Sequence, residues 1–384
     1  MKLEDVAVLG VGMTRFGVYP DKSVADLARE AGFLALDDAG VSFPEVSEAF
    51  TGYLFSGVMT GVRVMKEFGL TGLPVTHVEN ASATGLVCFR DAAYAVASGR
   101  ARIAMALGFD KMTEAAGGGP RSMSTSGAID NVIMPIAFFA LWAMRRMHER
   151  GTKPEHLARI AAKNWNNGAL TPGSHRQSDH QISVEEVLAA KMIAEPHTAM
   201  MACPVDDGAA CAILGPVELA KKLNPGRPVV RVRASALQSE RYTPGHTFLG
   251  PVVGPATMTR DTANQAYQES GIDPADVNLA LCHDAFAIEE LQYYELLGFC
   301  GEGEAEKLLE QGETEIGGRI PFNTDGGLIA RGHPGGPTGL AQIHELVVQL
   351  RGEAGKRQVE NARTGLAHLV GGGSVCSVSL LQRD

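Results

Sequence analysis

The chain has 384 residues, 45% of them hydrophobic and 20% charged, which is typical of a globular protein but longer than one hydrophobic core usually supports. We therefore expect two core-forming units, or two halves of one fold. The formal net charge of −10, without a basic stripe, argues against a nucleic-acid-binding protein.

The chain shows no sign of secretion or membrane insertion. No charged region followed by an apolar core and a cleavage site precedes the first strand-like segment. The longest apolar stretch, roughly residues 133–144, is too short to span a bilayer. The six cysteines form no CxxC pattern and no zinc-like spacing. We therefore expect a cytoplasmic protein with free thiols, no metal site and no membrane span.

Strand and helix patterns alternate in the first part of the chain. Strands are predicted near residues 6–12, 46–53, 75–78 and 101–109. Ser23 is a plausible N-cap for a helix over residues 24–39, and a second helix-like run covers residues 86–98. This alternation predicts an α/β protein.

Residues 111–197 do not continue the alternation of strand and helix patterns. A glycine- and serine-rich loop at residues 117–124 precedes two predicted helices, at 133–150 and 154–166, and a short one at 184–191. We interpret this region as an insertion, because long excursions from a scaffold commonly bind substrate. Arg145, Arg146 and Lys163 are candidates for binding an anionic cofactor, and the sequence does not choose among them.

A second α/β unit follows. A strand at residues 209–214 and a helix at 216–223 lead to a Pro/Gly-rich connector at 224–228. Further strands are predicted at 229–236, at 277–282 and within 364–381, and further helices at 257–271, 285–297 and 338–351. The element order resembles that of the first unit, although no strong residue-level repeat is visible.

Ser82 lies among small residues at the start of a predicted helix. Free backbone N–H groups and the positive end of the helix dipole favour an anion there, which suits a nucleophile. Taken alone, Ser82 is explained at least as well as the N-cap of its helix.

Two histidines and a glycine-rich turn are further candidates. His283 follows a buried-looking strand, at the sheet edge where open α/β folds place ligands. His333 lies in a Gly/Pro loop before a helix, where it could act as a general base toward position 82. Gly371 lies in a turn that can offer backbone N–H groups to an oxyanion. For each, a purely structural role explains the isolated residue equally well or better.

Together these segments resemble the thiolase superfamily. Residues 80–85, 283–286, 296–300, 323–339 and 365–373 occur in the order and spacing of that family, over nearly the whole chain. The His-Asp-x-Phe segment beginning at His283 is most similar to sterol-carrier-protein-type thiolases and archaeal-type acetyl-CoA acetyltransferases. The resemblance implies a thiolase fold, in which two similar α/β halves form a layered αβαβα core with an inserted loop domain. The implied first half is residues 1–111 plus 199–223, the insertion 112–198, and the second half 228–384.

The resemblance also implies roles for the candidate residues. Ser82 takes the position of the nucleophile that accepts an acyl group from acyl-CoA, and His333 that of the base that activates it. His283 corresponds to the histidine that binds a thioester oxygen, and Gly371 to part of a second oxyanion hole. The family uses a coenzyme A thioester as substrate without a covalently bound cofactor. It forms homodimers or homotetramers, and members associate with a small zinc-ribbon/OB-fold accessory protein.

Two departures from the family pattern matter. The Ser82 position carries cysteine in thiolases, and an alkanol is far less acidic than a thiol. A second, acid/base cysteine is also missing, because its two possible positions are Leu369 and Ala285. Cys282 and Cys376 lie close in sequence, but neither is a clear substitute.

Three functions remain open. The first is an acyl-CoA C-acyltransferase of thiolase type, with Ser82 as a natural variant or a designed replacement of cysteine. The second is a thiolase-like aldolase that cleaves a β-hydroxyacyl-CoA with His283 and His333 and without an acyl-enzyme. The third is a non-catalytic acyl-CoA- or lipid-binding subunit, which would not need both histidines.

Overall fold

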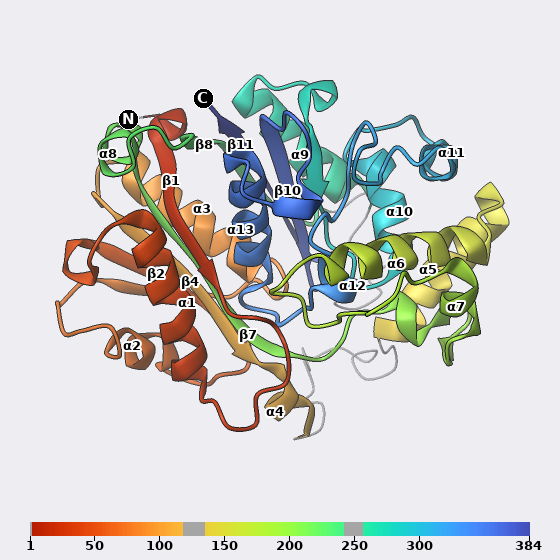
Figure 1. The fold of residues 1–384 in the computed structure, drawn as a ribbon, viewed down its shortest axis with the longest axis horizontal. Coiled ribbons are helices and arrows are strands. Elements are labelled where there is room, and N and C mark those ends of the chain that lie inside the picture. Colours follow the sequence, from red (N-terminus) through yellow and green to blue (C-terminus); the bar gives the residue numbers. More distant parts are fainter. Residues whose placement is uncertain (1, 118–134, 242–255) are drawn as a thin grey trace.

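The computed structural model describes residues 2–117, 135–241 and 256–384 (Figure 1). Within these ranges, nine strands form one mixed sheet in the order β3-β2-β4-β7-β1-β8-β11-β10-β9, and two short strands form a separate ribbon. The sheet strands are β1 (Val6–Met13), β2 (Glu48–Gly52), β3 (Val75–Val78), β4 (Ala104–Lys111), β7 (Asp207–Pro216), β8 (Val230–Ser239), β9 (Leu279–Leu281), β10 (Thr364–Gly371) and β11 (Val375–Arg383). The ribbon strands are β5 (Met192–Ala194) and β6 (His197–Thr198).

The described α-helices agree with the sequence prediction to within a few residues at their ends, except for four short ones at residues 60–65, 112–117, 305–310 and 327–330 that were not predicted. The α-helices are α1 (Val24–Ala39), α2 (Thr60–Met65), α3 (Thr84–Ala97), α4 (Met112–Gly117), α5 (Pro135–Arg150), α6 (Pro154–Ala169), α7 (Val184–Ala189), α8 (Val217–Leu223), α9 (Ala256–Ser270), α10 (Ala287–Leu296), α11 (Ala305–Glu310), α12 (Gly327–Ala330) and α13 (Thr338–Arg351). Ser23 caps α1 as predicted, because its side chain accepts a hydrogen bond from the Asp26 N–H. Most of the loop predicted at residues 117–124 lies outside the described residues.

The sheet contains the same strand order twice. Outward from the junction between β1 and β8, one half reads β1, β7, β4, β2, β3 and the other reads β8, β11, β10, β9. Beyond β9, Phe322 forms a parallel bridge with Ala280, in the place that β3 occupies in the first half. The last two strands of the second half, β10 and β11, are joined by a tight turn, whereas helices α5–α7 separate β4 from β7. Two similar α/β halves are therefore confirmed at the level of topology.

Helices cover both faces of each half. Val6 and Val8 of β1 belong to one hydrophobic core, and the alternating Ala7 and Leu9 belong to another. Helix α1 packs on one face of the first half, and α9 packs on β8 and β11 of the second. Helices α3 and α13 lie against each other between the halves, and Figure 1 shows α13 between their strands. This arrangement confirms the layered αβαβα core. In the described part of the chain, no helix is both long and apolar enough to cross a membrane.

Two glycines let α3 and α13 approach at their first turns. A Cβ atom added to Gly339 would lie 2.3 Å from the Leu86 N atom, and one added to Gly85 would lie 2.8 Å from the Leu340 N atom. Real Cβ atoms do not come this close to backbone, so only glycine fits. The contact places the beginnings of both central helices next to each other.

We expect Gly339→Ala to lower the free energy of unfolding by about 1–3 kcal/mol, because overpacking forces backbone to move. Urea unfolding followed by circular dichroism measures the change. Gly17→Ala is the matched control, since the nearest atom to an added Cβ there is 3.7 Å away. Equal stability of the two variants would contradict the close-contact argument.

Candidate active site

Ser82 lies in the tight turn that joins β3 to α3. Ala81 adopts a left-handed conformation with φ of 48°, which is strained for a residue with a side chain. The helix N-cap is Ala83, without a side-chain cap, and the N–H of Asn80 donates to Oγ1 of Thr84 at 2.8 Å. The interpretation of Ser82 as an N-cap is therefore wrong, and its hydroxyl is directed elsewhere.

The Ser82 hydroxyl meets His333. Its Oγ lies 3.1 Å from Nε2 of His333, and the other ring nitrogen, Nδ1, lies 2.8 Å from Oγ1 of Thr338. Thr338 donates its only hydroxyl proton to the Pro334 carbonyl at 2.6 Å, so it accepts from Nδ1–H. The proton on Nδ1 leaves Nε2 as an acceptor for the Ser82 hydroxyl, which is the geometry of a nucleophile and its base.

Burial keeps this imidazole neutral. Desolvation, with smaller contributions from His283 and Arg331, holds the pKa of His333 well below its ordinary value. A neutral ring at physiological pH has a free lone pair on Nε2. His333 is thus suited to accept a proton from a neighbouring hydroxyl.

Two buried carboxylates hold the loop that carries His333. Oδ1 of Asp206 accepts the His333 N–H at 3.0 Å, and Oδ2 of Asp110 accepts the Gly336 N–H at 2.7 Å. A Cβ atom on Gly332 would lie 1.9 Å from Oδ2 of Asp206, so the approach requires glycine. Desolvation raises the pKa of each carboxyl to about 6 despite these hydrogen bonds. The two buried carboxylates therefore fix both ends of the loop.

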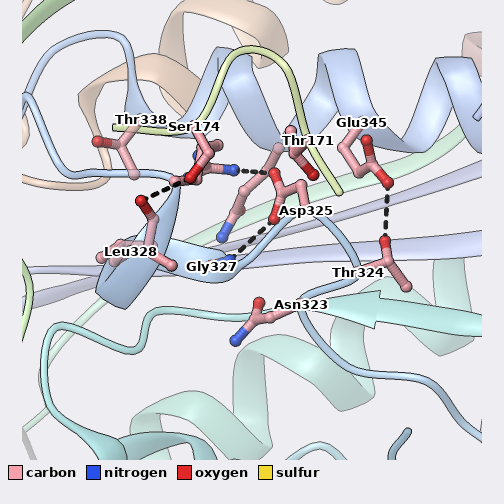
Figure 2. Close-up of polar contacts among 12 residues, drawn as sticks. Thr171, Ser174, Asn323, Thr324, Asp325, Gly327, Leu328, Thr338 and Glu345 are labelled. Carbon is pink, nitrogen blue, oxygen red and sulfur yellow. Dashed lines mark hydrogen bonds and ion pairs between the residues drawn. The ribbon is translucent and has the colours of Figure 1, made fainter. Parts of the chain in front are cut away.

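The segment before the loop is tied to α13 and to the end of β9. Figure 2 shows Thr324 beside Glu345 of α13, with their oxygens 2.8 Å apart, and Asp325 beside Gly327, whose N–H it accepts at 3.0 Å. Asp284, the neighbour of His283, accepts the Leu328 N–H at 2.6 Å. These contacts hold together the segment that carries His283 and the segment that leads to His333.

His283 lies beside His333 and is held by a carboxylate. The two ring centroids are 5.4 Å apart and the rings are perpendicular. Nδ1 of His283 lies 2.7 Å from Oε1 of Glu289, whose Oε2 accepts the Phe286 N–H at the start of α10. Nε2 of His283 is buried and has no hydrogen-bond partner among the described residues.

Ser82, His283 and His333 line a common cavity of about 310 Å³. Its other polar lining includes Cys203, Glu289 and Tyr293. Much of the remaining wall is apolar and aromatic: Phe139, Trp142, Met258, Phe286, Leu296 and Val370. Such a site, apolar with a few convergent polar groups, is typical of a small-molecule pocket. The three side chains that the sequence singled out are thus brought together.

Gly371 lies at the edge of this constellation. A Cβ atom there would lie 2.0 Å from the Asn80 carbonyl oxygen, so the glycine packs directly against the Ser82 turn. The cavity itself is lined by its neighbours Val370, Gly372 and Gly373. Gly372 and Gly373 both have positive φ and lie in the three-residue turn, 372–374, between the paired Gly371 and Val375. An oxyanion role for Gly371 stays a prediction.

The cavity is lined by a cysteine, Cys203, that the sequence analysis did not single out. Leu369 is fully buried in β10, whereas Ala285 lines the cavity. Cys203 also lines the cavity, and its N–H donates to the Ala285 carbonyl at 2.8 Å. Burial raises the pKa of the Cys203 thiol to about 12, so it stays protonated at neutral pH. Neither Cys282 nor Cys376 lines the cavity.

The candidate anion-binding cations are mostly engaged elsewhere. Arg146 pairs with Glu295 and Glu306, and the buried Lys163 pairs with Glu290. The exposed Arg145 bonds to Glu149 on its own helix. Arg146 and Lys163 are therefore structural ion pairs, which a sequence cannot show because their partners lie more than a hundred residues away.

The comparisons with known proteins agree with this geometry. The chain matches the family model "Thiolase, N-terminal domain" over residues 6–218 and "Thiolase C-terminal domain-like" over residues 252–383. It is 37% identical to the acetyl-CoA acetyltransferase of Methanothermobacter thermautotrophicus, covering 99% of this chain and 100% of that protein. It is 36% identical to sterol carrier protein 2 of Homo sapiens, covering 98% of this chain and 72% of that protein. The chain belongs to the thiolase family, as the sequence motifs predicted.

A solved structure named "Ltp2-ChsH2(DUF35) aldolase" superposes with a TM-score of 0.84. It is 24% identical in sequence and covers 99% of this chain and 98% of that one. The likeness supports the thiolase fold. At this level of identity, it says nothing about the reaction.

We expect His333 to stay neutral well below pH 6.5, because burial removes the stabilisation of its charged form. Nitrogen-15 NMR of histidine-labelled protein, assigned with His333→Gln, measures its titration. The exposed His180 is the internal control, since hydrogen bonds to Asp179 and Glu186 raise its pKa. At pH 6.5 His180 should be more charged than His333; a charged His333 there would contradict the proposal that it acts as a base.

Proposed function

We propose that the protein is an acyl-CoA C-acyltransferase of thiolase type, which forms or cleaves the carbon–carbon bond of a 3-ketoacyl-CoA. The observation that carries this proposal is the 3.1 Å contact between Oγ of Ser82 and Nε2 of His333. Because Thr338 takes the Nδ1–H, the serine hydroxyl has a base ready to accept its proton. The similarity to an archaeal acetyl-CoA acetyltransferase over the whole chain supports the same reaction class.

Acyl transfer begins at Ser82. Oγ attacks the thioester carbonyl carbon while Nε2 of His333 takes its proton, and the C–S bond then breaks as the proton passes to the departing CoA thiolate. The backbone N–H of Ser82 and the glycine-rich turn at Gly371, which packs against the Ser82 turn, are proposed to bind the oxyanion. His283, once it carries a proton on Nε2, is proposed to bind the carbonyl oxygen of the second substrate. No step needs a metal or a covalently bound cofactor.

Serine makes this reaction slower than cysteine would. An alcohol yields far less nucleophilic anion at neutral pH than a thiol does, so the reaction depends more on His333. The resulting oxygen ester is also a poorer acceptor for a carbanion than a thioester is. Ser82 therefore favours a slow transferase or a form that retains its substrate.

Thiolase-like aldol cleavage of a β-hydroxyacyl-CoA is the second candidate. It is favoured by a specific observation: Leu369 and Ala285 leave the site without the expected second thiol, while both histidines remain. Aldol cleavage needs a base for the β-hydroxyl and donors for the enolate, but no acyl-enzyme. A purely non-catalytic subunit is less favoured, because such a subunit does not need a buried histidine hydrogen-bonded to a serine.

The region between β4 and β7 is proposed to cover the substrate. We propose a division into residues 1–111 plus 199–223, 112–198 and 228–384, in which 112–198 is the inserted part. Met112, Phe139 and Trp142 from that part line the cavity, which supports contact with the acyl chain and the pantetheine of CoA. We also propose a cytoplasmic location, in keeping with six cysteines that form no disulfide.

The protein is further proposed to form a homodimer or homotetramer. Strand β3 is an edge of the sheet, and large apolar side chains are exposed near it: Val58, Met59, Val62 and Leu70. A hollow of about 450 Å³ beside α2 is lined by three of these residues, Val58, Met59 and Val62. A small zinc-ribbon/OB-fold accessory protein is proposed as a second partner, since the name of the similar structure joins Ltp2 to ChsH2(DUF35).

We expect Ser82→Cys to cleave acetoacetyl-CoA in the presence of CoA at least about 10²-fold faster than the unmodified protein, because the thiolate is the better nucleophile. Loss of the absorbance of the 3-ketoacyl-CoA enolate measures the rate. Ser82→Ala is the control and should be inactive. No thiolysis by Ser82→Cys, together with release of a carbonyl fragment from a β-hydroxyacyl-CoA by the unmodified protein, would replace the transferase with the aldolase.

A further inference from the structure

The two ring nitrogens of His283 have very different surroundings. Nδ1 lies 2.7 Å from Oε1 of Glu289, whereas Nε2 is buried without a hydrogen-bond partner in the described part of the chain. The ring lines the cavity next to Ser82 and His333. A buried nitrogen without a partner is costly, so its position indicates a group that arrives with the substrate.

Glu289 is built to hold this ring. Its carboxylate is 2% exposed and accepts three hydrogen bonds, from His283, from the Phe286 N–H at 3.1 Å and from the Tyr293 hydroxyl at 3.3 Å. The carboxylate keeps the proton of His283 on Nδ1 and leaves the lone pair on Nε2. It also compensates the positive charge that arises when Nε2 takes a second proton, as the carboxylate of a catalytic triad does.

The remaining titratable groups around His283 do not offset this charge. The groups that face it come from four elements: Glu289 and Tyr293 of α10, His333 of the 332–336 loop, His368 of β10, and Cys203 before β7. Burial and His283 hold the pKa of His368 well below its ordinary value, so this ring is neutral. Tyr293 and Cys203 keep their protons because burial raises the pKa of each. Glu289 is thus the group best placed to stabilise a charged His283.

The two histidines of the site have different hydrogen-bond partners behind them. His333 bonds to a neutral hydroxyl, that of Thr338, and His283 bonds to a carboxylate. A carboxylate behind an imidazole can compensate the charge of a protonated ring, whereas a neutral hydroxyl cannot. His333 serves the Ser82 hydroxyl, which leaves His283 for the other proton that carbon–carbon chemistry must move.

We propose that Nε2 of His283, oriented by Glu289 as a positioning residue, removes and returns the proton on the α-carbon of a bound acyl-CoA. This proposal rests on the proposed function and assigns the task of the acid/base cysteine that is absent at Leu369 and Ala285. The α-C–H bond breaks, its electron pair forms the enolate of the thioester, and the proton is carried on Nε2. Reprotonation or attack on an electrophilic carbon completes the step, without an oxidant or a further reactant.

Exchange of α-hydrogen for deuterium tests the proposal without any carbon–carbon bond being formed. Acetyl-CoA and hexanoyl-CoA are incubated with the protein in deuterium oxide, and the acyl group is weighed by mass spectrometry. The unmodified protein should exchange the α-hydrogens of at least one of these thioesters. Glu289→Gln, which keeps the Phe286 N–H contact, should lower the exchange rate by about 10²-fold, in the range of a positioned acid/base group.

The pH profile distinguishes positioning from mere packing. Glu289→Gln removes the counter-charge that lies 2.7 Å from a protonated His283, so the acid limb of its pH profile should move to lower pH. A structural defect would lower the rate at every pH alike. Glu186→Gln is the matched control, because it removes the carboxylate from the exposed His180–Glu186 pair and should change nothing.

Each outcome decides one question. Absent exchange in the unmodified protein, an unchanged rate in Glu289→Gln or an unshifted limb overturns the assignment. If Glu289→Gln does not fold, the test uses Glu289→Asp. This variant should keep the pH profile of the unmodified protein at a several-fold lower exchange rate. An undiminished exchange rate in Glu289→Asp would overturn the assignment. Glu289-dependent exchange without thiolysis by Ser82→Cys would retain this assignment and remove the acyl-transfer function. Thiolysis with Glu289-independent exchange would do the reverse.

Discussion

The hydrogen bond between Ser82 and His333 is the contact on which the site depends, and it joins residues 251 positions apart, from opposite halves of the fold. It forms because α3 and α13 meet at their first turns, where Gly85 and Gly339 admit backbone against backbone. A helix beginning is the natural place for a nucleophile, since free N–H groups are available there. The duplicated α/β topology brings two such beginnings together, one with the hydroxyl and one with the base. The site is therefore a property of the interface between the halves.

Holding the His333 loop in place has a cost in stability. Asp110 and Asp206 are buried, and desolvation raises the pKa of each to about 6. Between the unfolded carboxyl value near 4 and pH 6, the folded state therefore binds more protons than the unfolded state, so each group makes folding less favourable as pH rises through this window. The carboxylates nevertheless fix the N–H groups of His333 and Gly336. The fold gives up stability for the position of one imidazole, as functional sites commonly do.

The sequence predicted most of the elements from local patterns, and it singled out the three central side chains through the joint order and spacing of their motifs. Alternation of strand and helix patterns gave the α/β class, and Ser82, His283 and His333 lie in short loops with recognisable neighbours. What it missed depends on the third dimension. Arg146 and Lys163 looked available because their glutamates are distant in sequence. Glu289 was also missed, although a local signal was present in the sequence. It lies six residues after His283, in the first turn of the following helix, where an acidic side chain caps the backbone.

The loss of both thiols and the presence of Glu289 belong to one argument. A thiol can accept and return a proton by itself, whereas a histidine gains that ability from the group behind it. With Leu369 and Ala285 in the cysteine positions, our proposal gives proton transfer at carbon to His283, and Glu289 supplies the counter-charge. Ser82 shifts the nucleophilic step in the same direction, because an alcohol needs His333 where a thiol would need it less. With these proposed roles, both changes move the chemistry from sulfur to imidazole and make the site a two-histidine centre on a thiolase fold.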